Sequence, residues 1–211
     1  LPRVSNLLSS GNQKAVNKLH EMSFLVYNLV IFPMIAGILI VNKDFVNFFL
    51  GQDFQDARYA IAIMVFRMFF IGWTNIMGIQ ILIPHNRNRE FMLSTTIPAV
   101  FSVGLNFLLI PPLGYIGASI VSVATEGLVW FIQLYFTRSY LKEVKILPSM
   151  LKILLASLLM YGALYSVQAF IHFSSVVNVL IYAVLGFLVY GGLILVLRVL
   201  DFQELKSVLK K

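Results

Sequence analysis

The sequence contains no cysteine and few charged residues. Without cysteine, none of its 211 residues can form a disulfide, a thiolate metal site or a cysteine nucleophile. Charged residues make up 12% of the chain and hydrophobic residues 59%, whereas ordinary soluble domains are about 25% charged. A soluble protein this apolar could not cover its surface with polar groups. Composition therefore predicts an integral membrane protein.

The motifs of several enzyme classes are also missing. The sequence has no glycine-rich phosphate loop with a following lysine, no HExxH and no GxSxG. Its three histidines, His20, His85 and His172, are scattered. We therefore expect a non-enzyme, with no catalytic residues, no metal and no cofactor. The net charge of +7 is explained by basic residues at the cytoplasmic ends of membrane spans, so we expect no nucleic acid partner.

Six stretches are long and apolar enough to cross a bilayer, which takes about 20 residues of helix. They cover residues 22–41, 59–83, 91–110, 114–136, 153–171 and 174–197. Short polar connectors between them predict antiparallel neighbours. Open strand edges cannot persist in hydrocarbon, and no barrel-like alternation is present. The predicted fold class is an all-α membrane protein, a polytopic bundle of six transmembrane helices.

Basic residues are distributed unequally between the two sets of connectors, and this bias predicts orientation. The outer set, "NKDFVNFFLGQDFQDAR", "PPLGY" and "HFSS", holds only Lys43 and Arg58. The other set is much more basic, so both ends of the segment are expected to face the cytoplasm, in a multi-pass protein of the cell (cytoplasmic) membrane. Its basic residues are Arg3, Lys14, Lys18, Arg87, Arg89, Arg138, Lys142, Lys145, Lys152, Arg198, Lys206, Lys210 and Lys211.

Two charged residues, Arg67 and Glu126, lie well inside predicted spans. An arginine at a helix centre costs roughly 2.5–3.5 kcal/mol on insertion scales. Counted from the outer ends of their spans, the two residues differ in depth by roughly 3 Å at 1.5 Å per residue, so they can meet. The pair is either a static link between helices, or a site in which Arg67 meets an anionic substrate and Glu126 is its partner or a proton or cation site.

Polar residues share helical faces with this pair. Residues three and four apart lie on one face of a helix. Three predicted spans therefore each carry one polar face, and we expect these faces to converge on a hydrated cavity. The candidate cavity residues beside Arg67 and Glu126 are Thr74, Asn75, Ser102, Asn106 and Ser122.

Four motifs, in order, carry a family resemblance over residues 1–136. They are "LPRVSNLLSSGN" at 1–12, "FFLGQDFQDA" at 48–57, "IQILIPHNRNREF" at 79–91 and "NFLLIPPLGYIGASIVSVATE" at 106–126. With them the chain resembles the C-terminal part of a Wzx-type polysaccharide flippase, of the multidrug/oligosaccharidyl-lipid/polysaccharide exporter superfamily. Residues 137–211 match only as two further spans.

The resemblance implies a two-lobed transporter fold whose missing N-terminal lobe would be a partner of this segment. It implies residues 1–21 as a cytoplasmic amphipathic link, 22–136 as a four-helix portion of the C-terminal transport lobe, and 137–211 as two peripheral helices with a cytoplasmic tail. The implied activity is translocation of undecaprenyl-diphosphate-linked oligosaccharides by alternating access, coupled to H+ or Na+. Membrane lipids and polysaccharide assembly machinery are the other implied partners.

Three other functions stay open at this point. One is a multidrug/cation antiporter of the same superfamily, which would need a net acidic cavity. Another is a membrane-embedded glycan polymerase or acyltransferase, which would need a large outer loop or a histidine inside a span. The third is a scaffold of a polysaccharide assembly complex, which would leave the polar faces unexplained.

Overall fold

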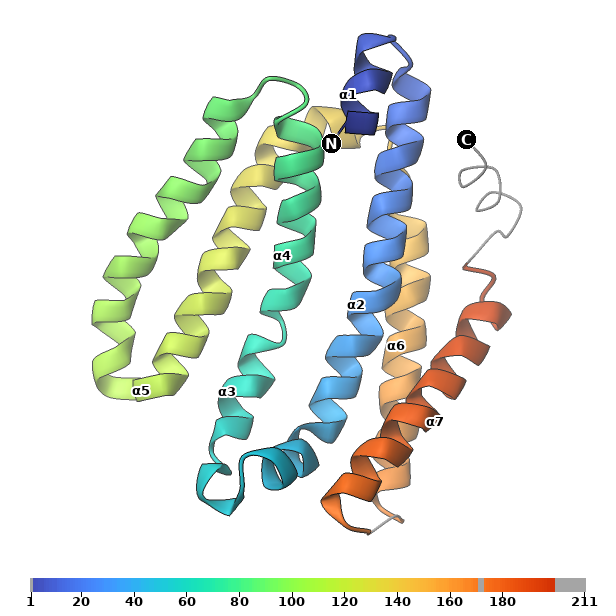
Figure 1. Cartoon of the computed structure of the whole chain (residues 1–211). Coiled ribbons are helices and arrows are strands. Elements are labelled where there is room, and N and C mark those ends of the chain that lie inside the picture. Colours follow the sequence, from blue (N-terminus) through green and yellow to red (C-terminus); the bar gives the residue numbers. More distant parts are fainter. Residues whose placement is uncertain (1, 171–172, 200–211) are drawn as a thin grey trace. The chain divides into compact units, whose positions relative to one another are not determined.

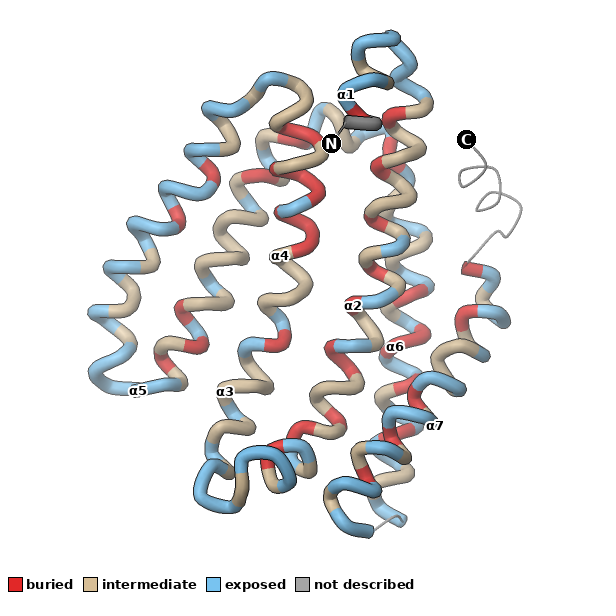
Figure 2. Tube along the Cα trace, viewed as in Figure 1, coloured by how far each residue is buried: buried red, intermediate tan, exposed pale blue. Residues whose placement is uncertain are grey.

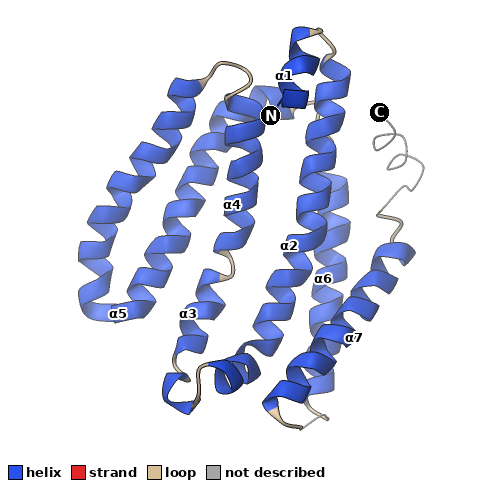
Figure 3. Cartoon of the chain, in the orientation of Figure 1, coloured by secondary structure: helices blue, strands red, loops and turns tan. Residues whose placement is uncertain are grey.

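The computed structural model describes residues 2–170 and 173–199, and in this part of the chain every regular element is helical (Figures 1 and 3). The predicted cytoplasmic tail beyond residue 199, and His172, lie outside the described residues. The helices are α1 (Pro2–Ser9), α2 (Gln13–Phe49), α3 (Ala57–Met64), α4 (Arg67–Asn75), α5 (Asn88–Leu141), α6 (Leu147–Gln168) and α7 (Ser175–Val196), with the 3₁₀ turn η1 (Gln52–Phe54) and the π-helix η2 (Ile76–Leu82).

Five helical stretches in the described residues are long and apolar enough to cross a membrane: α2, Ala57–Leu82, α5, α6 and α7. The prediction of an all-α, multi-pass membrane protein is confirmed. Large side chains such as Phe107 and Phe187, 80% and 79% exposed, would be an aggregation liability in water. On a membrane-spanning helix the same side chains face lipid.

Helix α5 is bent back on itself at Gly114. If straight, its 54 residues would extend roughly 80 Å, far more than a hydrocarbon core of about 30 Å. Gly114 has φ 55° and ψ −133°, a conformation open to glycine and strained for other residues. The two arms, residues 88–113 and 115–141, fold into the hairpin of Figure 1. They contain the predicted spans 91–110 and 114–136, and the total of six spans stays a prediction.

The described residues form two compact units, which do not follow sequence order. Unit 1 consists of Asp56–Ile146 with the described residues up to Ile31, and unit 2 of Phe32–Gln55 with the described residues from Leu147 onward. Helix α2 contributes to both, and the division falls beside Pro33, which lacks a backbone N–H. The predicted boundaries at residues 21/22 and 136/137 differ from this grouping and stay predictions.

Unit 2 is held by a small apolar core with polar links. The core consists of Ala36, Ile40, Met160, Leu164 and Tyr182. The Gln168 side-chain amide donates to the backbone carbonyl of Ile40 at 2.8 Å. Inside a membrane such a hydrogen bond keeps the side-chain amide from being an unsatisfied polar group in hydrocarbon.

The most buried part of unit 1 is the second half of the Ala57–Leu82 stretch (Figure 2). Trp73 in α4 and Met77, Ile81 and Leu82 in η2 are buried. On α2, Phe24 is fully buried and its ring lies 4.7 Å from that of Trp73. These large side chains form the apolar centre of unit 1.

The Ala57–Leu82 stretch is not a regular α-helix. Between α3 and α4 the backbone tightens to 3₁₀-type bonds, because the Phe66 N–H donates to Ile63 at 3.3 Å and the Met68 N–H to Val65 at 3.2 Å. After α4 it widens into the seven-residue π-helix η2. Such departures within a span are uncommon and often lie at functional sites, and here they bracket the helix that begins with Arg67.

Candidate functional site: an arginine–glutamate pair in a polar cavity

Arg67 and Glu126 form an ion pair between α4 and the second arm of α5. Arg67 Nη2 donates to Glu126 Oε1 at 2.9 Å, and Arg67 Nε donates to the same oxygen at 3.3 Å. Both donors converge on one carboxylate oxygen, which is a weaker arrangement than a fork on two oxygens. The side chains are 38% and 21% exposed respectively. The pair is therefore half-buried and accessible from a space beside it.

That space is a cavity of about 240 Å³ whose wall includes the ion pair. Residues of α4 and of both arms of α5 line it: Arg67, Ser102, Asn106, Ala118, Val121, Ser122, Thr125 and Glu126. Typical small-molecule sites measure about 300–1,000 Å³. The cavity is too small for an oligosaccharide but large enough for a small charged group.

The hairpin of α5 explains how residues so distant in sequence line one cavity. Gly114 reverses the chain, and Gly117 lets the arms approach, because a Cβ at Gly117 would overlap the Leu109 carbonyl. Glu126 lies twelve residues beyond Gly114, roughly 18 Å along the helix. This depth is near the middle of a bilayer core of about 30 Å.

Five of the seven predicted site residues line this cavity: Arg67, Glu126, Ser102, Asn106 and Ser122. Thr74 and Asn75 do not. Thr74 is 8% exposed, and its hydroxyl donates to the Ile71 carbonyl at 2.9 Å. Asn75 lines a different cavity, facing α2. The cavity extends from Arg67 toward the Gly114 turn rather than along α4, so a shared helical face does not bring these two residues into it.

The uncharged polar residues of the cavity bond mainly within their own helices. Asn106 Nδ2 donates to the Ser102 carbonyl at 2.9 Å, and Thr125 Oγ1 donates to the Val121 carbonyl at 2.7 Å. Ser, Thr and Asn commonly bond to the preceding turn in this way. Of the interactions described for the cavity residues, the ion pair alone joins two helices, so the interhelical chemistry of the site depends on Arg67 and Glu126.

An aromatic cluster lies one turn away from the pair, and sequence reasoning did not identify it. The Trp73 and Trp130 rings are 6.1 Å apart, and Phe70 lies 5.8 Å from Trp130. Trp130 follows Glu126 by four residues and shares its helical face. The i, i+4 spacing places Trp130 on the face of Glu126, but its aromatic partners Trp73 and Phe70 are 57 and 60 residues away in sequence and give no local signal.

Fold and site together define a helical, multi-pass membrane protein with an ion pair beside an intramembrane cavity. Over its full length, the chain is 24% identical to an uncharacterized membrane protein of Methanocaldococcus jannaschii. It is 22% identical, over 99% of its length, to a probable low-salt glycan biosynthesis flippase of Haloferax volcanii. It is 27% identical, over 65% of its length, to a candidate O-antigen transporter of Escherichia coli.

These alignments cover 41%, 44% and 33% of the three relatives, so the chain spans less than half the length of the curated relatives it matches. No protein-family model and no solved structure matches the chain. The similarity therefore supports a relation to flippase-like membrane proteins.

Proposed function

We propose that the protein carrying this chain is a flippase that moves an undecaprenyl-diphosphate-linked oligosaccharide across the cytoplasmic membrane by alternating access. The observation that carries this proposal is the Arg67–Glu126 pair in a polar cavity. The names of two relatives, a glycan biosynthesis flippase and an O-antigen transporter, support the glycan class. No bond is made or broken in this function, which agrees with the expectation of a non-enzyme.

The size of the cavity indicates which part of the substrate it holds. About 240 Å³ accommodates an anionic group such as a phosphate, and excludes a string of sugars. The glycan then passes through a larger space, to which a second lobe of the transporter contributes. The lipid tail stays in the bilayer throughout, since only the polar headgroup needs a path away from hydrocarbon.

In this proposal Arg67 binds the diphosphate and Glu126 controls Arg67. A guanidinium presents a planar fork of donors that matches phosphate oxygens. In the structure two of those donors converge on one oxygen of Glu126, so an arriving phosphate competes for them. Protonation of Glu126, or binding of a cation to it, weakens its hold on Arg67. H+ or Na+ could therefore drive the exchange as a coupling ion.

The test is export by Arg67 variants of the protein that carries this chain. Surface glycan is measured in a strain lacking the gene, complemented with Arg67→Ala, with Arg67→Lys or with the control Arg138→Ala, which removes an exposed arginine outside the cavity. Membrane-fraction protein is quantified in parallel. We expect normal protein levels with export lost for Ala, partly kept for Lys and unchanged for the control.

Normal export by Arg67→Ala would overturn the proposal. A net acidic cavity is what a cation or drug antiporter would need. A gain in resistance to cationic drugs on removal of Arg67, with glycan export unchanged, would therefore favour the antiporter.

A further inference from the structure

The Tyr27 side chain extends from α2 and contacts the backbone of α4 within about one turn of Arg67. Its hydroxyl donates to the Met68 carbonyl and accepts from the Gly72 N–H, which lies 3.2 Å from the hydroxyl oxygen. Residues 68 and 72 are the i and i+4 positions that an α-helix joins directly. The hydroxyl therefore bonds to both backbone groups of one i, i+4 pair at the start of α4, the position at which an intruding side chain can bend a helix.

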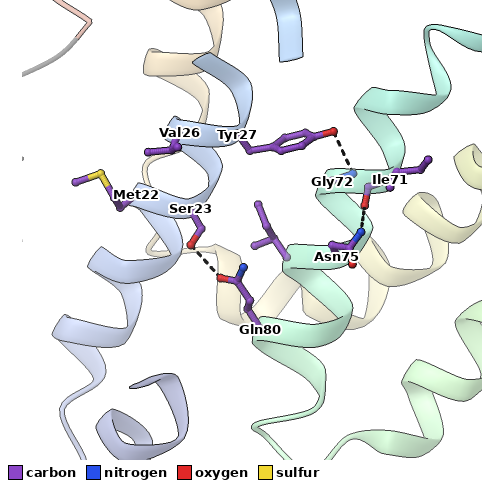
Figure 4. A pocket seen from close by; sticks show the side chains of 9 residues that line it. Met22, Ser23, Val26, Tyr27, Ile71, Gly72, Asn75 and Gln80 are labelled. Carbon is purple, nitrogen blue, oxygen red and sulfur yellow. Dashed lines mark hydrogen bonds between the residues drawn. The ribbon is translucent and has the colours of Figure 1, made fainter. Parts of the chain in front are cut away.

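This contact depends on glycine at position 72. A Cβ there would overlap the Tyr27 ring, so any other residue would push the ring away. Figure 4 shows Tyr27 lying across the gap from α2 with its hydroxyl at Gly72. Tyr27 and Gly72 thus fit each other as a pair.

The ring also has space to leave. Tyr27 and Gly72 line a second cavity, of about 580 Å³, between α2 and the α4–η2 stretch (Figure 4). On its wall Ser23 Oγ donates to Gln80 Oε1 at 2.9 Å, a second link between the same segments. The Met68 carbonyl and the Gly72 N–H are i and i+4 partners of an α-helix, so they stay satisfied when the hydroxyl withdraws. The hydrogen bonds of the Tyr27 hydroxyl with Met68 and Gly72, called the Tyr27 brace below, can therefore be released.

We propose that Tyr27 is a positioning residue for Arg67. Arg67 is the first residue of α4, and the next residue, Met68, is the one whose carbonyl accepts from the Tyr27 hydroxyl. By bonding to both the Met68 carbonyl and the Gly72 N–H, the Tyr27 hydroxyl fixes the first turn of α4. It thereby keeps the Arg67 guanidinium against Glu126. Withdrawal of Tyr27 lets this turn move and opens the ion-pair cavity. This inference deepens the proposed function and depends on it for what Arg67 binds.

The first experiment follows opening of the cavity without any transport. Because residues 1–211 contain no cysteine, a Ser122→Cys reporter labels uniquely once any cysteine outside them has been replaced. Its reaction rate with a small hydrophilic maleimide is compared for Tyr27→Phe, Gly72→Ala and two controls. The controls are Tyr165→Phe, on the exposed side of α6, and Gly162→Ala, where a Cβ meets nothing within 4 Å.

We expect Tyr27→Phe to raise the labelling rate about fivefold, from the typical net strength of one hydrogen bond, and Gly72→Ala to raise it at least as much. The controls should leave it unchanged. An effect of Gly72→Ala without one of Tyr27→Phe would overturn the brace, since ring packing rather than the hydroxyl would then matter. Unchanged labelling in both variants would overturn it as well.

The second experiment asks whether Tyr27 acts through Arg67. Export is measured for Tyr27→Phe in the native background and in an Arg67→Lys background, which keeps part of the export. Positioning of the guanidinium predicts a large loss in the first and a smaller proportional loss in the second, whereas a general structural role would lower export by the same factor in both. If labelling responds to Tyr27→Phe while Arg67→Ala leaves export normal, the brace stands and the proposed function fails.

Discussion

Exchanging the two charges of the ion pair separates a structural role from a substrate role. The variant combines Arg67→Glu with Glu126→Arg and is compared with each single change. In the singles, two like charges face each other at the 2.9 Å contact. In the double variant an ion pair can form again, but the guanidinium extends from α5 instead of from the start of α4.

The cost of each single change follows from the exposure of the pair. Fully exposed pairs contribute about 0–1 kcal/mol, and breaking a buried pair costs about 3–5 kcal/mol. Side chains that are 38% and 21% exposed lie between these limits, so we expect about 2 kcal/mol. Since about 1.4 kcal/mol is a factor of ten, the ratio of folded to unfolded protein should fall about thirtyfold in each single variant.

The assay measures membrane-fraction protein and surface glycan in the same cells. We expect the exchange to restore the protein level but not export, because a binding group must be held within about 0.5 Å of its working position. Glu90→Gln is the matched control. It disrupts the Arg87–Glu90 pair, which has the same 2.9 Å distance and similar exposure outside the cavity. Recovery of both protein and export in the exchanged variant would refute a substrate role for Arg67.

Three further predictions concern the fold. Gly114→Ala should lower the free energy of unfolding in detergent by about 1–3 kcal/mol, because φ is 55° there; Gly104→Ala, at an open helical position, should be neutral or stabilising. Asn28→Leu should cost about 1–3 kcal/mol, because the Trp73 indole N–H loses its 2.9 Å acceptor; adding Trp73→Phe should recover part of that loss, and thermal melts of the three variants would show it. A cysteine at Asp53 should react with an impermeant maleimide added to intact cells, and protection from outside would reverse the predicted orientation.

Hydropathy predicted long apolar helices but not where the helices end. The predicted span 22–41 lies inside α2, which continues from Gln13 to Phe49, because helix continues through polar ends that hydropathy counts as connector. Gly114 illustrates the opposite case. The "PPLGY" connector between two predicted spans predicts a reversal, and the structure has it at Gly114, whose backbone conformation few residues other than glycine tolerate.

The candidate cavity was partly predictable for a similar reason. Arg67 and Glu126 could be paired from depth alone, since charges inside hydrocarbon need partners. Tyr27 could not be found this way. Its hydroxyl bonds to backbone atoms. Every residue has a backbone carbonyl, so the sequence does not show which one is the partner. The breaks on both sides of α4 were likewise invisible, because Val65, Phe66 and the residues of η2 continue the hydrophobic stretch without a proline or a charged residue to mark an interruption.

The π-helix η2 sets the rotational register of everything that follows it. In an uninterrupted α-helix, Gln80 would lie about 80° around the axis from Gly72, whereas in the structure both residues line the cavity facing α2. A π turn holds more residues than an α turn, and so behaves like a one-residue insertion into an ordinary helix. If the same residues wound as an ordinary α-helix, Gln80 would turn by about 100° and move away from Ser23, whereas deleting one residue within residues 76–79 would let the segment close to an α-helix and leave Gln80 in place. The length of this segment, as well as its composition, is therefore part of how unit 1 is assembled.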